Sequence, residues 1–325
     1  DRPRVMPLVL RMALAGLSCL LVLSCTAIRP VAKIGLLAPF EGLYRRTGYN
    51  ALAAMRAALA DAPPASPDLL PLALDSSVDP VRATQKLLAD PLLAGLVGPF
   101  SLKSVDAIEP LLTSGGEPWF VPFAVEPAGG FAMPGQVGEW MTPLLEKASQ
   151  AAQRAGCRRL VIAGWPATWP TESLTAIGAR TGLTVAQVDD AAQVQVDDAV
   201  LHLGEADAAA IFANHLPDTG RRPPFFLGLQ GDDPVFAEHS QSVEGIAWLA
   251  WVDDAYPAWA SGQEVASPSV YQVYRAAATA MAMITGRPQA DPSPWQLQWF
   301  VYDSTGHAQR AEWPPATGCA VTQPD

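Results

Sequence analysis

Short apolar runs alternate with amphipathic segments through the first half of the chain. Apolar runs bounded by proline, glycine or polar residues predict strands at residues 31–39, 69–74, 92–97 and 119–123. Between them, apolar residues at helical spacing predict a helix at residues 48–62 and helices that begin after Asp79 and Ser101, both favoured N-cap residues. Repeated strand-then-helix units predict a parallel sheet covered by helices.

The same alternation restarts after a Gly/Pro-rich stretch at residues 127–135, which marks a crossover between two lobes. The expected strands are residues 160–163, 184–188, 199–203, 224–229 and 245–251, with a final hairpin of 296–302 and 307–312. The expected helices are 140–155, 171–180, 207–216 and 269–284. We therefore predict an α/β fold of two doubly wound parallel-sheet lobes with a cleft between them.

The predicted division follows from this order of elements. Lobe 1 comprises residues 31–135 plus about 250–290, lobe 2 comprises 136–249, and 291–325 form a C-terminal hairpin and tail. A chain of 325 residues is long enough to bury two separate cores.

The amino terminus has the pattern of an export signal. Three arginines precede an uncharged run from Met12 to Leu23, which is too short to span a bilayer. The run ends in Val22-Leu23-Ser24-Cys25, which resembles a bacterial lipobox. We expect a signal peptide at residues 1–24, lipidation of Cys25 and a tether at 25–30. The alternative is a short buried helix with an incidental cysteine.

Charge and cysteine content limit the classes of binding partner and the compartment that we expect. The 32 acidic against 21 basic residues give a net charge of −11, which disfavours nucleic-acid binding, and loss of residues 1–24 would make it −13. Cys157 and Cys319 would then remain, in a compartment that permits disulfides. We slightly favour two separate thiols over one bridge, because Cys157 opens a buried strand whereas Cys319 lies in the tail.

Several segments resemble, in order, those of a known family. Residues 33–42 followed by 48–55 resemble the opening of type I periplasmic binding proteins of the branched-chain amino acid family, the solute receptors of ABC importers. Further similar segments are Asp75 with Asp79-Pro80, then 96–101, 118–124, 198–204, 224–228 and 243–247. The resemblance spans about residues 31–290. The chain departs from the family in its trimmed second lobe and its ten tryptophans.

The resemblance implies a monomeric solute-binding lipoprotein, exported and anchored to a bacterial membrane on its periplasmic side or on the cell surface. It would capture an amino acid or similar small polar solute by lobe closure and present it to an ABC permease, without a cofactor. A regulatory lipoprotein of the same fold, acting through a protein partner as cell-wall synthase activators do, is the alternative. A hydrolase is the third hypothesis.

In doubly wound sheets, ligands bind where strands end and helices begin. There we expect hydroxyl and backbone donors for a carboxylate or carbonyl, aromatic rings for an apolar or planar part, and a carboxylate for an ammonium group. The candidate ligand-binding residues are Tyr44, Phe100, Ser101, Ser104, Phe123, Ala124, Trp165, Trp169, Asp232 and Trp251. Ser101 as a plain helix cap, the two tryptophans packed on their own lobe, and Asp232 as a solvated loop acid are the alternatives.

Catalytic and metal motifs are missing from the sequence. The four histidines are scattered, and no metalloprotease, nucleophile-elbow, phosphate-loop or dinucleotide pattern occurs. Paired acids such as Asp189-Asp190 lack the spacing of a calcium loop, so we interpret them as solvated turns. We predict no catalytic residues, no metal site and no enzymatic activity.

Overall fold

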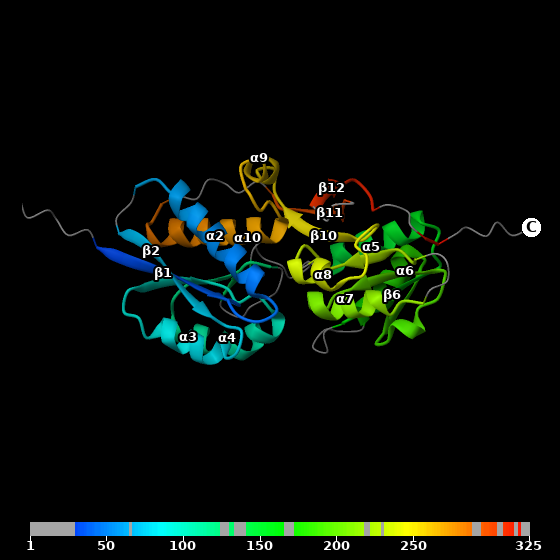
Figure 1. Ribbon diagram of the computed structural model, residues 1–325, viewed down its shortest axis with the longest axis horizontal. Coiled ribbons are helices and arrows are strands. Elements are labelled where there is room, and N and C mark those ends of the chain that lie inside the picture. Colours follow the sequence, from blue (N-terminus) through cyan, green and yellow to red (C-terminus); the bar gives the residue numbers. More distant parts are fainter. Residues whose placement is uncertain are drawn as a thin grey trace, which may run out of the picture.

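The computed structural model describes residues 30–64, 67–123, 130–132, 141–165, 172–217, 222–228, 231–287, 294–303, 308–314 and 318–319. These residues form two lobes, each built around its own sheet (Figure 1). The predicted α/β class, with two sheets covered by helices, is confirmed. The described residues contain no helix both long and apolar enough to cross a bilayer.

Lobe 1 contains a five-stranded parallel sheet in the order β2-β1-β3-β4-β5. Its strands are β1 (Val31–Ala38), β2 (Asp68–Asp75), β3 (Leu93–Val97), β4 (Trp119–Val121) and β5 (Phe131–Ala132). Its helices are α2 (Arg45–Asp61), α3 (Pro80–Leu88), α4 (Leu102–Gly115) and α10 (Pro268–Ile284). Asp79 and Ser101 cap α3 and α4 through their side chains, as the sequence predicts.

Side chains that alternate along β1 enter two different cores. Ile34 and Leu36 pack with α2 and α10 on one face of the sheet, whereas Leu37 packs with α3 and α4 on the other. Because both faces are covered by helices, the strand is apolar along most of its length rather than alternating. Helix α10 thus completes lobe 1, although it follows most of lobe 2 in the sequence.

Lobe 2 contains a seven-stranded sheet in the order β12-β11-β10-β9-β8-β6-β7. Its strands are β6 (Arg159–Ala163), β7 (Thr184–Val188), β8 (Asp198–His202), β9 (Phe225–Leu227), β10 (Ala247–Val252), β11 (Gln296–Tyr302) and β12 (Ala308–Ala311). Helices α5 (Met141–Arg154) and α6 (Glu172–Thr181) cover one face, and α7 (Ala206–Asn214) and α8 (Pro234–His239) cover the other. A short 3-10 helix, η1 (Ala191–Gln193), precedes β8.

The last three strands extend the second sheet beyond its parallel part. Strand β10 is parallel to β9, and β11 and β12 add to it antiparallel. The predicted lobe boundary near residue 250 falls inside β10, and the hairpin that we separated as 291–325 pairs with this sheet. The chain therefore crosses between the lobes three times, from β5 to α5, from β10 to α10 and from α10 to β11.

The preference for two separate thiols is wrong. Cys157, just before β6, and Cys319, near the carboxyl terminus, form a disulfide with a Cα–Cα distance of 4.9 Å. Both residues are buried in the core of lobe 2 that contains α5 and α6. The chain returns to this core at Cys319, a return that residue spacing does not reveal.

Candidate functional site

The first turn of α2 contacts lobe 2 directly. Its approach to β1 depends on Gly48, since a Cβ at this position would lie 1.9 Å from the carbonyl oxygen of Pro39. Three bonds from this turn reach lobe 2, and we call them the α2 contacts. The Tyr44 hydroxyl donates to Asp207 at 2.7 Å, the Thr47 hydroxyl donates to Asp233 at 2.8 Å, and Arg46 pairs with Glu238.

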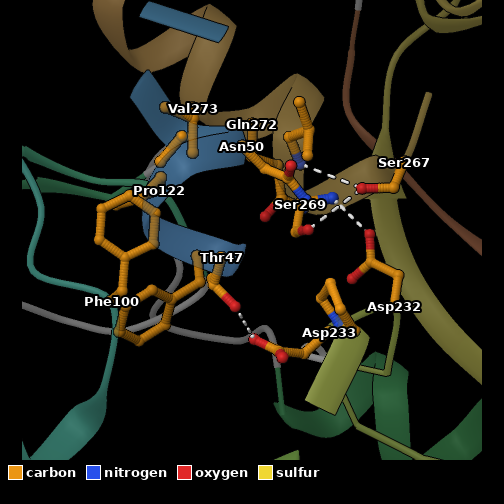
Figure 2. A pocket seen from close by; sticks show the side chains of 14 residues that line it. Thr47, Asn50, Phe100, Pro122, Asp232, Asp233, Ser267, Ser269, Gln272 and Val273 are labelled. Carbon is orange, nitrogen blue, oxygen red and sulfur yellow. Dashed lines mark hydrogen bonds between the residues drawn. The ribbon is translucent and has the colours of Figure 1, made fainter. Parts of the chain in front are cut away.

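A cavity of about 40 Å³ lies beside these contacts, between the lobes (Figure 2). Lobe 1 supplies part of its lining from α2, from the β3–α4 loop and from the end of β4: Thr47, Asn50, Ala51, Phe100, Pro122 and Phe123. The start of α10 supplies Ser267, Ser269, Val270, Gln272 and Val273, and lobe 2 supplies Asp232, Asp233 and Pro234. Because a water molecule needs roughly 10–15 Å³ on this measure, the cavity has room for about three waters.

Asp232 connects lobe 2 to the N-terminus of α10. Its Oδ2 accepts a hydrogen bond of 2.8 Å from the backbone N–H of Ser269, in the first turn of the helix. A carboxylate is stabilised in this position by the helix dipole. Its Oδ1 is buried without a hydrogen-bond partner in the described part of the chain. Burial raises the pKa of Asp232, against the lowering effect of the hydrogen bonds from Ser269 and Ser267.

Further carboxylates of lobe 2 lie next to the α2 contacts. Asp233 is buried, caps α8 through the Val235 N–H, and has a pKa raised to about 6, mainly by burial. Glu205, at the start of α7, has a pKa raised to about 7 by burial and by the nearby charges of Asp207 and Asp233. Within the described chain, no group of His, Cys, Asp or Glu side chains is arranged to hold a metal ion.

A second junction between the lobes lies where the chain leaves β10 for lobe 1. It is formed mainly by aromatic rings and one ion pair. Helix α9 (Tyr256–Ala260) packs its Tyr256 and Trp259 rings against Tyr271 of α10 at centroid distances of 5.3 and 5.0 Å. The buried carboxylate of Asp253 pairs with Arg275 and accepts a hydrogen bond from the Tyr271 hydroxyl. The guanidinium carbon of Arg275 lies 5.6 Å from the centre of the Trp295 ring, just before β11.

We call Asp253, Tyr256, Trp259, Tyr271, Arg275 and Trp295 the hinge cluster. It joins both crossover segments to α10, and α9 lies at the top of Figure 1, over the junction of the lobes. Its buried rings Tyr256 and Tyr271 belong to the same core as Phe300 in β11.

Three of the candidate residues from the sequence meet at the cavity. Phe100 and Phe123 line it from lobe 1, and Asp232 lines it from lobe 2. Tyr44 lies at the α2 contacts instead, with its hydroxyl on Asp207. Ala124, Trp169 and the lipidation candidate Cys25 lie outside the described residues.

The other candidates lie away from the cavity lining. The Ser101 hydroxyl accepts from the Ser104 N–H and donates to the Ser104 hydroxyl, so both residues stabilise the start of α4. Trp165 is buried in the core of lobe 2, and Trp251 packs against the same core. The backbone oxygen of Trp251 accepts a hydrogen bond from the Gln272 side chain, which does line the cavity.

Sequence reasoning missed most of the polar lining. Thr47, Asn50, Ser267, Ser269 and Gln272 come from the N-terminal ends of α2 and α10. A signal for the α10 residues is present, since Ser267-Pro268 combines a favoured N-cap with a favoured first-turn residue. Placing that helix start at the cleft requires the crossover from lobe 2, which the local pattern does not contain.

Comparisons with known proteins bear on the fold. No family model matches the sequence, and no curated protein matches it. A leucine-binding protein of Thermotoga maritima superposes with a TM-score of 0.67 at 13% identity, over 86% of this chain and 97% of that one. A branched-chain amino acid transporter substrate-binding protein from Streptococcus pneumoniae, in complex with isoleucine, superposes with a TM-score of 0.61 at 14% identity. The match covers 81% of this chain and 86% of that one.

A third solved structure widens the range of bound ligands. An ABC transporter solute-binding protein of R. palustris, in complex with benzoate, gives a TM-score of 0.56 at 13% identity, over 90% of this chain and 98% of that one. Identities this low show a shared fold and no more. The chain therefore has the type I periplasmic binding protein fold, as its sequence motifs suggest.

Proposed function

We propose that the protein is an extracytoplasmic, lipid-anchored solute-binding protein of an ABC importer. In this proposal it captures an amino acid or similar small polar solute between its lobes, as a monomer, and the closed form is recognised by a membrane permease. Binding shifts an equilibrium between open and closed lobes by the difference in affinity of the solute for the two forms.

One observation carries this proposal. The cavity is lined by both lobes and by α10, with polar groups and aromatic rings facing the same space. Neither lobe alone assembles this lining, so the full set of contacts exists only when the lobes are together. This is the arrangement that couples solute binding to closure.

A thermal-shift screen of the purified protein tests solute binding. Amino acids, amides and short peptides are added at millimolar concentration, and the midpoint of unfolding is followed. A solute that binds the native form at a hundred times its Kd raises stability by about 2.7 kcal/mol, which is a shift of several degrees. Absence of a shift with every solute would contradict the proposal.

The anchor is tested separately. We expect the mature protein to begin at Cys25 with a covalent lipid, which the mass of its N-terminal peptide would reveal. Cys25→Ala should leave solute binding intact and abolish the lipid modification, because the thiol that carries the lipid is gone. A wild-type protein that keeps residues 1–24 would contradict this part of the proposal.

A regulatory lipoprotein acting through a protein partner is the second candidate, and two observations favour it. The cavity of about 40 Å³ is small, and the α2 contacts join the lobes directly, side chain to side chain. A partner that binds the outer surface needs no solute. Failure of every solute to shift the unfolding midpoint would favour this function.

The hydrolase hypothesis finds less support. Within the described residues, the hydroxyl of Ser101 bonds to Ser104 and has no histidine partner. A serine nucleophile needs an adjacent general base.

A further inference from the structure

The charges at the cavity are unbalanced. Its described lining includes the carboxyl groups of Asp232 and Asp233 and no lysine, arginine or histidine. A ligand carboxylate would therefore enter a space that already holds two acids and offers no cationic side chain to pair with it.

Several hydrogen-bond donors at the cavity are already engaged by the protein. The Thr47 hydroxyl donates to Asp233, and the Gln272 amide donates to the Trp251 carbonyl. At the start of α10, the Ser269 N–H donates to Asp232 and the Val270 N–H to the Ser267 hydroxyl. The helix N-terminus would otherwise attract an anion, but here it is already occupied by a protein carboxylate.

One acceptor remains unsatisfied. Oδ1 of Asp232 is buried without a hydrogen-bond partner among the described residues, and Figure 2 shows it directed into the space between Ser269, Thr47 and Asp233. A buried carboxylate oxygen that lacks a donor costs free energy. Separately, burial of the whole carboxyl group disfavours its charged form and raises the pKa of Asp232. A cationic donor at this oxygen would remove that cost.

The wall across the cavity from Asp232 is apolar. Phe100, Pro122 and Val273 lie on the far side of the space from Asp232 in Figure 2, and Phe123 also lines it. This surface suits a short hydrocarbon group rather than a second charge. Space for about three waters limits that group to a few carbon atoms.

We propose that the cavity binds a small organic ammonium cation that carries no carboxylate. The ammonium group donates to Oδ1 of Asp232, and the short hydrocarbon chain packs against Phe100 and Phe123. This inference rests on the proposed solute-binding function and narrows it, since a cation is selected over a zwitterionic amino acid.

Calorimetric titration of the purified protein with four three-carbon probes tests the selection. The probes are propylammonium, β-alanine, propionate and propionamide, at equal ionic strength and pH 7.5. We expect binding of propylammonium at least tenfold tighter than that of the other three. Asp232→Asn should weaken propylammonium binding at least tenfold, and the exposed-acid variant Asp189→Asn should not change it.

The possible outcomes separate the two proposals. If β-alanine or propionate binds as tightly as propylammonium, the cation selection is wrong and solute binding stands. If propylammonium binds equally to the Asp232→Asn protein, the assignment to Asp232 is wrong. If no probe binds and the wider solute screen also fails, solute binding itself is wrong. An Asp232→Asn protein that unfolds at the same temperature as wild type, or higher, shows that lost binding is not lost folding.

Discussion

The hinge cluster and the α2 contacts both join the two lobes, but they do so with different chemistry. The hinge cluster is aromatic, its Tyr256 and Tyr271 rings are buried, and the acid of its ion pair, Asp253 with Arg275, is almost without solvent contact. The α2 contacts are three polar bonds, one of them between the exposed side chains of Arg46 and Glu238.

If the lobes open as we propose, this difference indicates where they part. Separating the hinge cluster would expose several aromatic rings to water and leave a buried charge without its partner. Both changes cost free energy. Separating the α2 contacts exchanges hydrogen bonds between side chains for hydrogen bonds to water, at a small net cost. Opening should therefore rotate the lobes about the hinge cluster and part them at the α2 contacts, beside the cavity.

The largest effect is expected at the hinge. Arg275→Met leaves the Asp253 carboxylate buried without its cation and should lower the free energy of unfolding by about 3–5 kcal/mol. Chemical denaturation measures this loss. Adding Asp253→Asn to the same protein should restore part of it, because the stranded charge is gone. A loss below 1 kcal/mol in the single variant would show that this junction is not the stronger one.

Thr47→Val tests the buried member of the α2 contacts. The change keeps the shape of the side chain and removes the donor to Asp233, whose carboxylate is buried. We expect a loss of about 1–3 kcal/mol and a wider separation of the lobes, measured by denaturation and by small-angle X-ray scattering. Unchanged scattering together with unchanged stability would argue against a role for this bond in closure.

The acids near the α2 contacts predict a pH dependence. The pKa of Glu205 is raised to about 7 in the folded protein, so stability should increase as pH falls below 7 toward its ordinary value of 4.5. The pKa of Asp233 is raised to about 6, so its protonation also increases stability as pH falls below about 6. His202 acts in the opposite direction below 6.5, because burial lowers its pKa to about 4.

Because Asp232, Asp233 and His202 also change stability near pH 6.5, the contribution of Glu205 is measured as the difference between wild type and Glu205→Gln from pH 8 to 6.5. Glu205→Gln should raise stability by about 1–2 kcal/mol at pH 8, and this gain should shrink as pH falls to 6.5, because the wild-type carboxyl becomes protonated below about 7. Thermal unfolding across the interval measures both effects. A gain from Glu205→Gln that stays the same from pH 8 to 6.5 would contradict this assignment.

The smallest effect is expected at the exposed pair. Arg46→Met removes the partner of Glu238 and should cost less than about 1 kcal/mol, with a further decrease in 0.5 M salt. The same denaturation assay, run beside Arg275→Met, compares an exposed with a buried ion pair in one molecule. Equal losses from the two variants would remove the basis of the comparison.

Local pattern predicted long elements well and short ones poorly. The stripe of apolar residues placed α10 to within one residue of its start. Helices α8 and α9 and strand β5 were missed, because a helix of five or six residues spans fewer than two turns and a strand of two residues shows no alternation. Helix α2 begins at Arg45, three residues before the predicted start. The prediction began the helix at Gly48, whereas in the structure this glycine lies inside α2 and allows close approach to the Pro39 carbonyl.

Contacts between residues far apart in the sequence could not be predicted from the local pattern of hydrophobic and polar residues. Asp232 was identified because it follows a predicted strand, and strand ends gather at one edge of a sheet. Ser269, its partner at α10, lies 37 residues away in the chain. The disulfide joins residues 162 positions apart, and only the packing of the tail on lobe 2 brings them together.

The disulfide has a consequence for the integrity of the chain after proteolysis. The covalent ring that it closes, from Cys157 to Cys319, contains all seven strands of lobe 2 and also α10 of lobe 1. A single proteolytic cut at any point inside this ring leaves both fragments attached to each other. The damaged molecule would migrate as one species until a reductant is added, and α10 would stay tethered to its site in lobe 1.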